Sequence, residues 1–298
     1  MVRVNKNGKC AACRGHAFGA GSMFQVTRPR SRLESFVYIL ELIYHNSVRS
    51  VRKTHGNAFM AIFMNMLQTI IFVLAFYFMF QILGMRSAAL RGDFMVYIMT
   101  GVFLFMTHTK TLGAVSSSEG PASPMMQHAP MNTAIAIISA MVSTLYIQIL
   151  SLFAILFVYD VAFNPFVMED IHDPIGCLAM VILSWFSGAA IGLVFLAVKP
   201  WFPTPVSIIS TVYQRANMIA SGKMFVANTL PSSMLAMFDW NPLFHTIDQS
   251  RGYAFVDYNP RNSDWEYAFY LSIILVMIGL MGEFYTRKHA SASWSARR

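Results

Sequence analysis

The chain has 298 residues, of which 56% are hydrophobic and only 12% are charged, and its mean hydropathy is +0.50. Soluble domains carry about 25% charged residues, so this composition excludes an ordinary soluble protein and indicates an integral membrane protein. The net charge of +8 does not point to nucleic acid, because most Lys and Arg residues lie near the two termini, where they act as a topology signal.

Residues 1–30 are predicted to be a flexible cytoplasmic extension, because they are polar, rich in Arg and lack the apolar core of a signal peptide. They contain Cys10 and Cys13. A Cys-x-x-Cys pair is half of a common zinc site, but no second ligand pair follows, so we interpret the two as free thiols. With Cys177 they make three cysteines, which gives no disulfide framework.

Residues 31–55 are predicted to form an amphipathic helix in the cytoplasmic interface. Apolar side chains recur at three- and four-residue steps from Leu33 to Val51, and charged residues occupy the other side. The stretch ends in the basic run Arg52-Lys53-Thr54-His55.

Six segments follow that are predicted to cross the bilayer, whose core of about 30 Å needs roughly 20 apolar helical residues. They are 58–83, 93–115, 132–160, 174–198, 204–224 and 265–285, and the fifth is short and rich in polar residues. The predicted fold is an all-α membrane protein with six transmembrane helices, an N-terminal amphipathic interface helix and a re-entrant outward helical hairpin before the last span. Ten Lys and Arg residues precede residue 58, whereas the opposite loops are acidic, so both termini are predicted to be cytoplasmic.

The stretch Ser221–Gly252 is apolar enough to enter a bilayer, yet it contains Pro231 and Pro242, and a Pro inside a helix removes a backbone donor and clashes with the preceding turn. We therefore predict two short helical pieces, broken at Pro231 and near Asn241-Pro242, within a hairpin over residues 225–262. Irregular backbone at membrane depth persists only where it is buried in protein or lines a water-filled path, so this hairpin is the first candidate for function.

The predicted fifth span carries a polar stripe. Spacings of three and four residues place its members on one helical face: Ser207, Ser210, Gln214, Asn217 and Ser221. Arg215 flanks the stripe, where an unpaired charge in hydrocarbon costs roughly 3 kcal/mol. Two interpretations stay open. The stripe either hydrogen-bonds to a neighbouring helix or faces a hydrated path or a partner subunit, and Arg215 favours the second.

Several kinds of chemistry are missing from the sequence. It contains no P-loop, no His-Glu-x-x-His motif and no Gly-x-Ser-x-Gly elbow. Acidic residues within the predicted spans are scarce and lie near the span ends, which disfavours proton-coupled transport. The only tight acid/His group is Asp170-Ile171-His172-Asp173, which we interpret as a solvated loop before Pro174 rather than a metal site. Any uphill transport therefore needs a partner that supplies energy.

Aromatic residues make up 14% of the chain. Most Phe side chains are expected to face lipid or to pack between helices, but some aromatic rings are candidates for stacking on the C–H faces of a sugar. These candidates are Tyr97, Phe103, Trp185, Tyr213 and Trp240.

The order of these features resembles the membrane (permease) subunit of ABC-2-type polysaccharide exporters of the capsule-polysaccharide export type. The residues that carry the resemblance are Ser221-Gly222, Leu230-Pro231, Trp240-Asn241-Pro242-Leu243, His245 and Arg251. The interface helix followed by a basic turn and Gly56 also fits. The resemblance covers about residues 31–288, so residues 56–288 would form an ABC-2-type transmembrane domain and residues 289–298 a cytoplasmic tail.

The resemblance implies a non-catalytic channel subunit in the cytoplasmic (inner) membrane, with no cofactor bound directly. Two copies would pair with two copies of an ATP-binding cassette subunit, which binds ATP and Mg²⁺. The complex would pass a lipid-linked capsular polysaccharide outward to periplasmic and outer-membrane export proteins, and no nucleic acid is involved.

Three sets of site residues are expected: the glycan path from the aromatic residues and the polar stripe, the outward hairpin, and the contacts to the ATP-binding subunit that the resemblance implies. The expected glycan path is Tyr97, Phe103, Trp185, Tyr213, Gln214, Arg215, Asn217 and Trp240, and the outward hairpin is marked by Pro231, Asn241, Pro242, His245 and Arg251. The expected contacts to the ATP-binding subunit are Phe36, Leu40, Arg49, Arg52, Gln127 and His128. The loop 116–131 departs from the expected pattern, because Ser116–Pro124 is rich in Ser, Pro and Gly and lacks charged pairs.

Other functions stay open. The same fold could export O-antigen, teichoic acid or another lipid-linked glycan, and drug or lipid export is disfavoured by the Trp240–Leu243 segment. A membrane glycosyltransferase would need a carboxylate cluster near a membrane face, and Glu169, Asp170 and Asp173 are the only cluster available.

Overall fold

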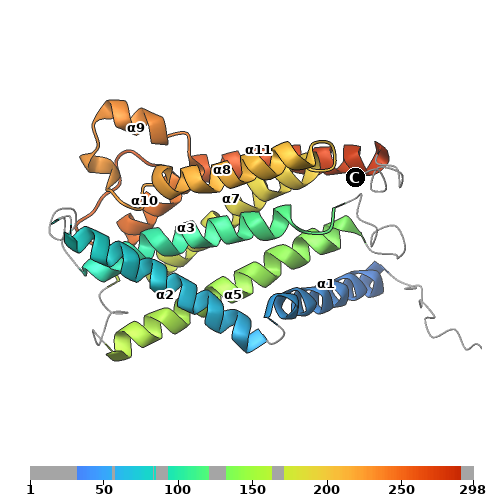
Figure 1. Ribbon diagram of the computed structural model, residues 1–298, viewed down its shortest axis with the longest axis horizontal. Coiled ribbons are helices and arrows are strands. Elements are labelled where there is room, and N and C mark those ends of the chain that lie inside the picture. The colour runs from blue at the N-terminus through green and yellow to red at the C-terminus, as the bar shows by residue number, and fades with distance from the viewer. Residues whose placement is uncertain are drawn as a thin grey trace, which may run out of the picture. The chain divides into compact units, whose positions relative to one another are not determined.

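The computed structural model describes residues 32–55, 58–82, 84, 93–120, 132–162 and 171–289, and these residues form helices, turns and loops with no strand (Figure 1). The chain divides into two compact units, Met1–Tyr38 and Ile39–Arg298. The described part of the first unit is the start of helix α1. All contacts discussed below lie within the second unit.

The predicted interface helix and all six predicted span segments are helical, and two further helices follow the fifth. The elements are α1 (Arg32–His55), α2 (Ala58–Ile82), α3 (Phe94–Ser116), α5 (Thr133–Ala162), α7 (Pro174–Val198), α8 (Pro203–Ala220), the 3₁₀ turn η1 (Ala227–Thr229), α9 (Ser232–Phe238), α10 (Pro242–Ala254) and α11 (Trp265–His289). Helix α8 ends before the predicted boundary of residue 224, because Gly222 adopts φ +74°, which is a left-handed conformation that ends a helix.

Four of the described helices are long and apolar enough to cross a membrane, namely Phe59–Ile82, Thr133–Val161, Pro174–Val198 and Trp265–His289. Helix α3 does not qualify, since its second half carries His108 and Lys110, and α8 has 18 residues with a polar stripe. The chain is therefore an α-helical membrane protein with four candidate spans in its described part. The total of six spans stays a prediction.

Helix α3 occupies the core, packed against α2, α5, α7 and α10. Its residues from Val96 to His108 are buried on all sides except at the half-buried Thr100, as expected for a helix that is apolar all round. Glycines let α7 approach closely, because a Cβ at Gly188 would lie 2.4 Å from the His108 carbonyl oxygen. Close backbone approach through small residues is how helices associate in membranes, where no hydrophobic effect drives them together.

The second half of α1 packs along α5. Ser47 Oγ donates a hydrogen bond to the Ser139 carbonyl (3.3 Å), and Ser139 Oγ donates to the Ile43 carbonyl (3.3 Å). The face of α1 that carries the apolar stripe is therefore only partly covered by the protein. Ser47 on this face is buried against α5, whereas Leu40 and Tyr44 remain exposed. The exposed apolar side chains fit the predicted membrane-surface position, which stays a prediction.

Candidate functional site

The segment between α8 and α11 breaks where the prolines predict. Pro231 immediately precedes α9, and Pro242 is the first residue of α10. Asn241 caps α10, since its side-chain oxygen accepts from the Leu243 backbone N–H at 3.1 Å. A Pro at the first helical position and an Asn cap are the usual start of a helix. The two breaks are confirmed, whereas the depth of this segment in the membrane stays a prediction.

Arg251 on α10 holds the turn that follows α8. It is 1% exposed, and its guanidinium donates to the carbonyls of Gly222 (3.0 Å), Lys223 (2.7 Å) and Phe225 (2.6 Å). The guanidinium carbon also lies 4.2 Å from the centre of the Tyr97 ring on α3. One buried cation therefore joins α10, the turn after α8 and the central helix.

Lys223 is the second buried cation of this junction and was not foreseen from the sequence. It is 2% exposed, and its Nζ lies over three rings: Phe72 at 4.9 Å, Phe76 at 4.8 Å and Phe105 at 3.5 Å from the ring centres. The negative faces of aromatic rings attract an ammonium group, and the attraction is strongest where water is excluded. The side chain thereby fixes the turn to α2 and α3. The only sequence signal was a single Lys in an apolar segment.

Unpartnered buried polar atoms gather at the same junction. Five buried side-chain atoms in the described part of the chain lack a hydrogen-bond partner. One is Gln148 Oε1 on α5, and the other four belong to this junction: Asn217 Nδ2, Ser221 Oγ, Lys223 Nζ and Arg251 Nε. A buried donor without a partner costs about 1–3 kcal/mol, so native proteins rarely keep several together. Such a concentration marks a candidate functional site rather than ordinary packing.

The polar stripe of α8 faces the protein at its C-terminal end. Ser210, Asn217 and Ser221 are buried, whereas Ser207 is exposed. Asn217 Oδ1 accepts from Asn241 Nδ2 at 2.7 Å, which ties α8 to the start of α10. The interpretation as hydrogen-bonding between helices therefore holds for this contact.

Arg215 lies on the other, exposed side of α8. Its neighbours on that side are the exposed apolar residues Ile208, Val212 and Ile219. An Arg side chain is costly in contact with hydrocarbon. This face of α8 therefore requires either the surface of another protein or a hydrated space beside it.

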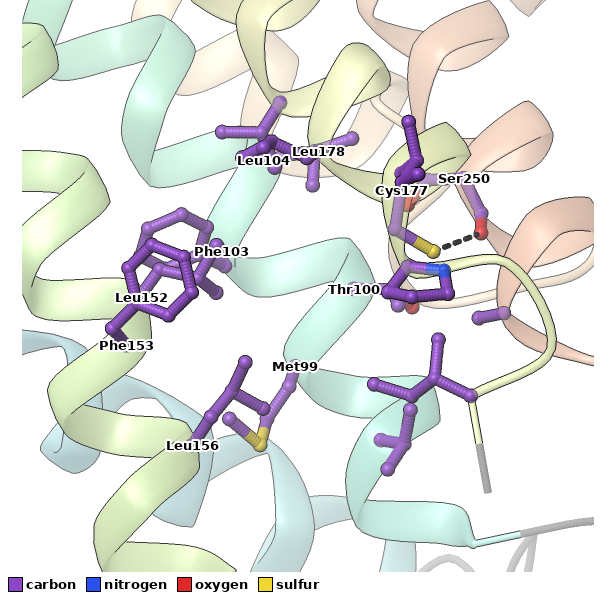
Figure 2. A pocket seen from close by; sticks show the side chains of 16 residues that line it. Met99, Thr100, Phe103, Leu104, Leu152, Phe153, Leu156, Cys177, Leu178 and Ser250 are labelled. Carbon is purple, nitrogen blue, oxygen red and sulfur yellow. Dashed lines mark hydrogen bonds between the residues drawn. The ribbon is translucent and has the colours of Figure 1, made fainter. Parts of the chain in front are cut away.

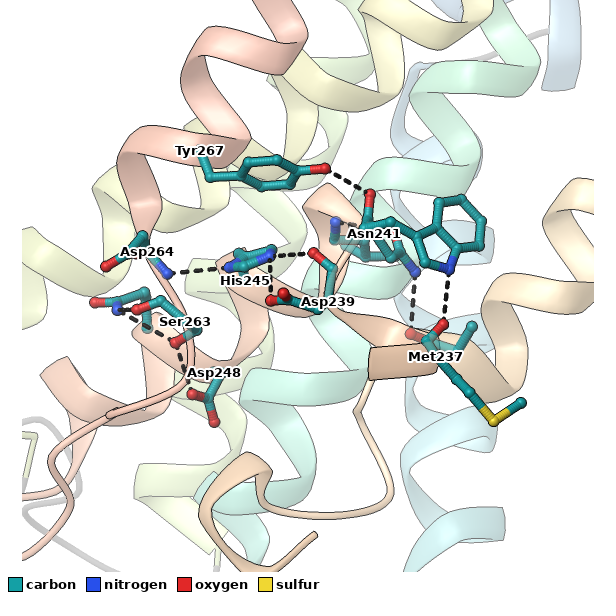
Figure 3. Close-up of polar contacts among 12 residues, drawn as sticks. Met237, Asp239, Asn241, His245, Asp248, Ser263, Asp264 and Tyr267 are labelled. Atoms are coloured by element: carbon teal, nitrogen blue, oxygen red, sulfur yellow. Dashed lines mark hydrogen bonds and ion pairs between the residues drawn. The ribbon is translucent and has the colours of Figure 1, made fainter. Parts of the chain in front are cut away.

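Polar contacts also close the hairpin against the start of α11 (Figure 3). His245 Nδ1 accepts from the Asp264 backbone N–H at 3.0 Å, so the ring carries its proton on Nε2, which donates to the Asp239 carbonyl at 2.6 Å. The Tyr267 hydroxyl on α11 donates to the Trp240 carbonyl at 3.0 Å. The Trp240 ring itself is 60% exposed.

The loop after α10 is fixed by Asp248. This buried carboxylate accepts from the hydroxyls of Tyr258 (2.5 Å) and Ser263 (2.7 Å). Burial, reinforced by the nearby negative charge of Asp248, raises the pKa of Tyr258 far above its usual range, so its hydroxyl stays a donor.

The remaining predicted path residues lie on α3, α7 and α8. Tyr97 and Phe103 are buried on α3, and Trp185 on α7 donates from its indole N–H to the Met141 carbonyl at 3.0 Å. Gln214 is half-buried and donates to Ser210 Oγ at 3.3 Å within its own helix. The structure brings Tyr97 into contact with Arg251, and the role of these residues in a glycan path stays a prediction.

Tyr213 joins α8 to the core through His108, a residue that the sequence did not single out. The Ser187 hydroxyl gives its proton to the Ser184 carbonyl (2.9 Å), so His108 Nδ1 donates to Ser187 Oγ at 2.9 Å. His108 Nε2 then accepts from the Tyr213 hydroxyl at 3.3 Å. These hydrogen bonds link α3, α7 and α8.

The predicted contacts to an ATP-binding subunit are only partly described. Leu40 and Arg49 are exposed on α1, and Phe36, in the first unit, is 59% exposed. The Arg52 side chain and the residues Gln127 and His128 lie outside the described residues.

The acidic group at residues 169–173 is likewise only partly described by the structure. Asp173 caps α7, accepting from the backbone N–H groups of Ile175 (3.1 Å) and Gly176 (3.0 Å), and His172 is exposed. Glu169, Asp170 and the Cys10–Cys13 pair lie outside the described residues. Among the residues that are described, no three His, Cys, Asp or Glu side chains come together as metal ligands would.

The four long apolar helices in the described part of the chain define a multi-pass α-helical membrane protein. The chain is similar to the polysialic acid transport protein KpsM of Escherichia coli, with 23% identity over 197 residues, which cover 63% of this chain and 71% of the relative. No protein-family model matches the chain. The match to KpsM confirms the resemblance to the membrane subunit of ABC-2-type capsule-polysaccharide exporters.

Proposed function

We propose that this chain is the permease subunit of an ATP-driven exporter, which moves a lipid-linked capsular polysaccharide outward across the inner membrane. The chain forms the channel, and a separate subunit hydrolyses ATP. The similarity to a polysialic acid transport protein supports the substrate class. The missing P-loop fits a division of labour in which another polypeptide binds the nucleotide.

The exposed face of α8 is the observation that carries this proposal. Arg215 stands among exposed apolar residues of a helix whose other face is bound to the protein. A cation facing hydrocarbon costs roughly 3 kcal/mol, so the proposal places this face on a hydrated conduit shared with a second copy of the chain. Two copies and two ATP-binding subunits would complete the transporter.

The conduit is tested by changing Arg215 while surface and internal polysaccharide are measured separately. Arg215→Leu should reduce surface glycan and leave finished glycan inside the cell, whereas Arg215→Lys should retain much of the export. Thr211→Leu is a matched control, since Thr211 is exposed on the same helix but uncharged. Normal export by Arg215→Leu at normal protein levels contradicts the conduit.

Association with an ATP-binding subunit is tested separately. Replacing residues 36–52 with an unrelated amphipathic sequence should abolish copurification of the ATPase, as should replacing residues 125–131. A solubilised wild-type chain that never copurifies with such a subunit contradicts the proposed ATP-driven mechanism.

The second candidate is export of O-antigen or teichoic acid by the same fold. Chemical analysis of the polysaccharide that accumulates inside export-deficient cells distinguishes these glycans from capsular polysaccharide. A membrane glycosyltransferase is a weaker candidate. If Glu169, Asp170 and Asp173 catalysed synthesis, their combined replacement by Ala would remove internal glycan as well as surface glycan.

A further inference from the structure

A cavity of about 250 Å³ lies between α3, α5, α7 and α10 (Figure 2). Its walls include Met99 and Phe103 on α3, Leu152 and Leu156 on α5, and Leu178 on α7. An apolar cavity of about 150 Å³ is already large enough to stay dry and hold a benzene ring. The cavity in this chain therefore has room for an elongated apolar group.

The wall is almost entirely apolar, and two of its polar side chains already have partners inside the protein. Thr100 Oγ1 donates to the Tyr97 carbonyl at 2.9 Å, and the Cys177 thiol donates to the Ser250 carbonyl at 3.6 Å (Figure 2). A buried water needs two to four polar partners, and a sugar presents several hydroxyl groups that must be hydrogen-bonded. The chemistry of the wall thus excludes water and glycan and favours a hydrocarbon chain.

The mouth of the cavity opens between two candidate spans. Phe153 on α5 is 48% exposed and Ile175 on α7 is 79% exposed, and both line the cavity. Exposed apolar side chains on membrane-spanning helices face lipid. Next to this mouth, the exposed His172 and the helix-capping Asp173 mark the polar end of α7.

We propose that this cavity binds one acyl chain of a membrane phospholipid, which enters between α5 and α7 with its headgroup at the level of His172 and Asp173. An empty cavity leaves its wall without dispersion contacts, and lipid chains are the hydrocarbon that surrounds this wall in the bilayer. Because Ser250 and Ala254 of α10 form part of the wall, the bound chain supports the helix that carries Arg251. The site does not depend on the identity of the exported substrate.

The test uses phosphatidylethanolamine carrying a photoreactive diazirine in one acyl chain, reconstituted with the full-length protein in lipid nanodiscs. After irradiation, mass spectrometry should locate adducts on the cavity walls, at Leu152–Leu156 and around Leu178. Leu178→Trp fills the cavity and should lower this yield by roughly tenfold, which corresponds to about 1.4 kcal/mol of lost binding. Ile278→Trp adds the same side chain at an exposed site on α11 and should leave the yield unchanged.

Leu152→Phe is a milder variant that fills the cavity from α5, and it serves if Leu178→Trp does not fold. Equal adduct yields at the cavity and across the exposed face of α11 would mean ordinary lipid contact and would overturn the proposal. Adducts that persist in both filled variants would do the same. A cavity that is labelled in monomers but protected in dimers would assign it to a second copy of the chain and also overturn the proposal.

Discussion

Replacement of Arg251 by Met removes the charge that joins α10 to the turn after α8 while keeping an unbranched side chain. Three hydrogen bonds of 2.6–3.0 Å and the contact with the Tyr97 ring are lost. A hydrogen bond from a charged donor contributes about 1.5–3 kcal/mol. The buried guanidinium also carries a desolvation cost that the Met variant avoids, so the contributions do not simply add.

We therefore expect Arg251→Met to lower the free energy of unfolding by about 3–5 kcal/mol, because three carbonyls at the junction lose their charged donor. Arg251→Lys keeps the charge but lacks the planar fork that reaches three carbonyls, so its loss should be intermediate. Arg261→Met is the matched control, because the Arg261 side chain is exposed, and its effect should stay below about 0.5 kcal/mol.

The assay is reversible unfolding of the detergent-solubilised protein by sodium dodecyl sulfate, followed by circular dichroism. Thermal unfolding is monitored in parallel by a thiol-reactive dye at the half-buried Cys177, with Cys10 and Cys13 replaced by Ser. If Arg251→Met unfolds at the same denaturant fraction as Arg261→Met, the argument that Arg251 holds the junction is refuted.

Three further predictions concern helix packing and the second buried cation. Gly188→Ala places a Cβ 2.4 Å from a backbone oxygen of α3 and should prevent stable folding, whereas Gly113→Ala meets nothing within 4 Å and should stabilise α3 by about 0.5–1 kcal/mol, as thermal unfolding would show. A double-mutant cycle of Asn217→Ala and Asn241→Ala should give a coupling energy of roughly 0.6–1.7 kcal/mol. Asn241→Ala alone should destabilise the protein more than Asn217→Ala alone, because it also removes a helix cap. Strictly additive effects of the two substitutions would contradict the contact. The Lys223→Met variant should unfold at or above the denaturant midpoint of the wild type, because it removes a buried ammonium group without a hydrogen-bond partner. A strong destabilisation would contradict this prediction and show that the contacts with the aromatic rings outweigh the desolvation cost of the ammonium group.

The helices were predictable because their signals are local. Apolar runs of sufficient length predicted the long helices, and Pro174 and Pro242 mark the starts of α7 and α10 to the residue. The breaks around α9 follow from the same backbone chemistry, since a Pro cannot continue a helix. The end of α8 was placed too late, because the left-handed conformation of Gly222 is not visible in an apolar run.

The junction was predictable only in part. Arg251 and Asn241 stood in the segment that carries the resemblance, but their partners are backbone carbonyls and an Asn on another helix, which spacing alone does not reveal. The ring contacts of Lys223 unite residues from α2 and α3, so they depend on tertiary packing. The hydrogen bond between His108 and Tyr213 was missed for the same reason.

Arg215 shows what a stripe on a helix can and cannot tell. The periodicity grouped it beside Asn217, yet in the structure Asn217 faces the protein and Arg215 is exposed. Two residues turn an α-helix by about 200°, so residues two apart in sequence point to nearly opposite sides.

The central claim, export of a finished polysaccharide, is tested most directly by deleting the gene and measuring where that polysaccharide is found. Surface and cytoplasmic glycan are quantified separately in the deletion strain, the complemented strain and the wild type. The account predicts that surface glycan disappears while full-length polysaccharide accumulates inside, and that complementation restores the surface. A deletion strain with no polysaccharide in either compartment would contradict export and indicate a role in synthesis.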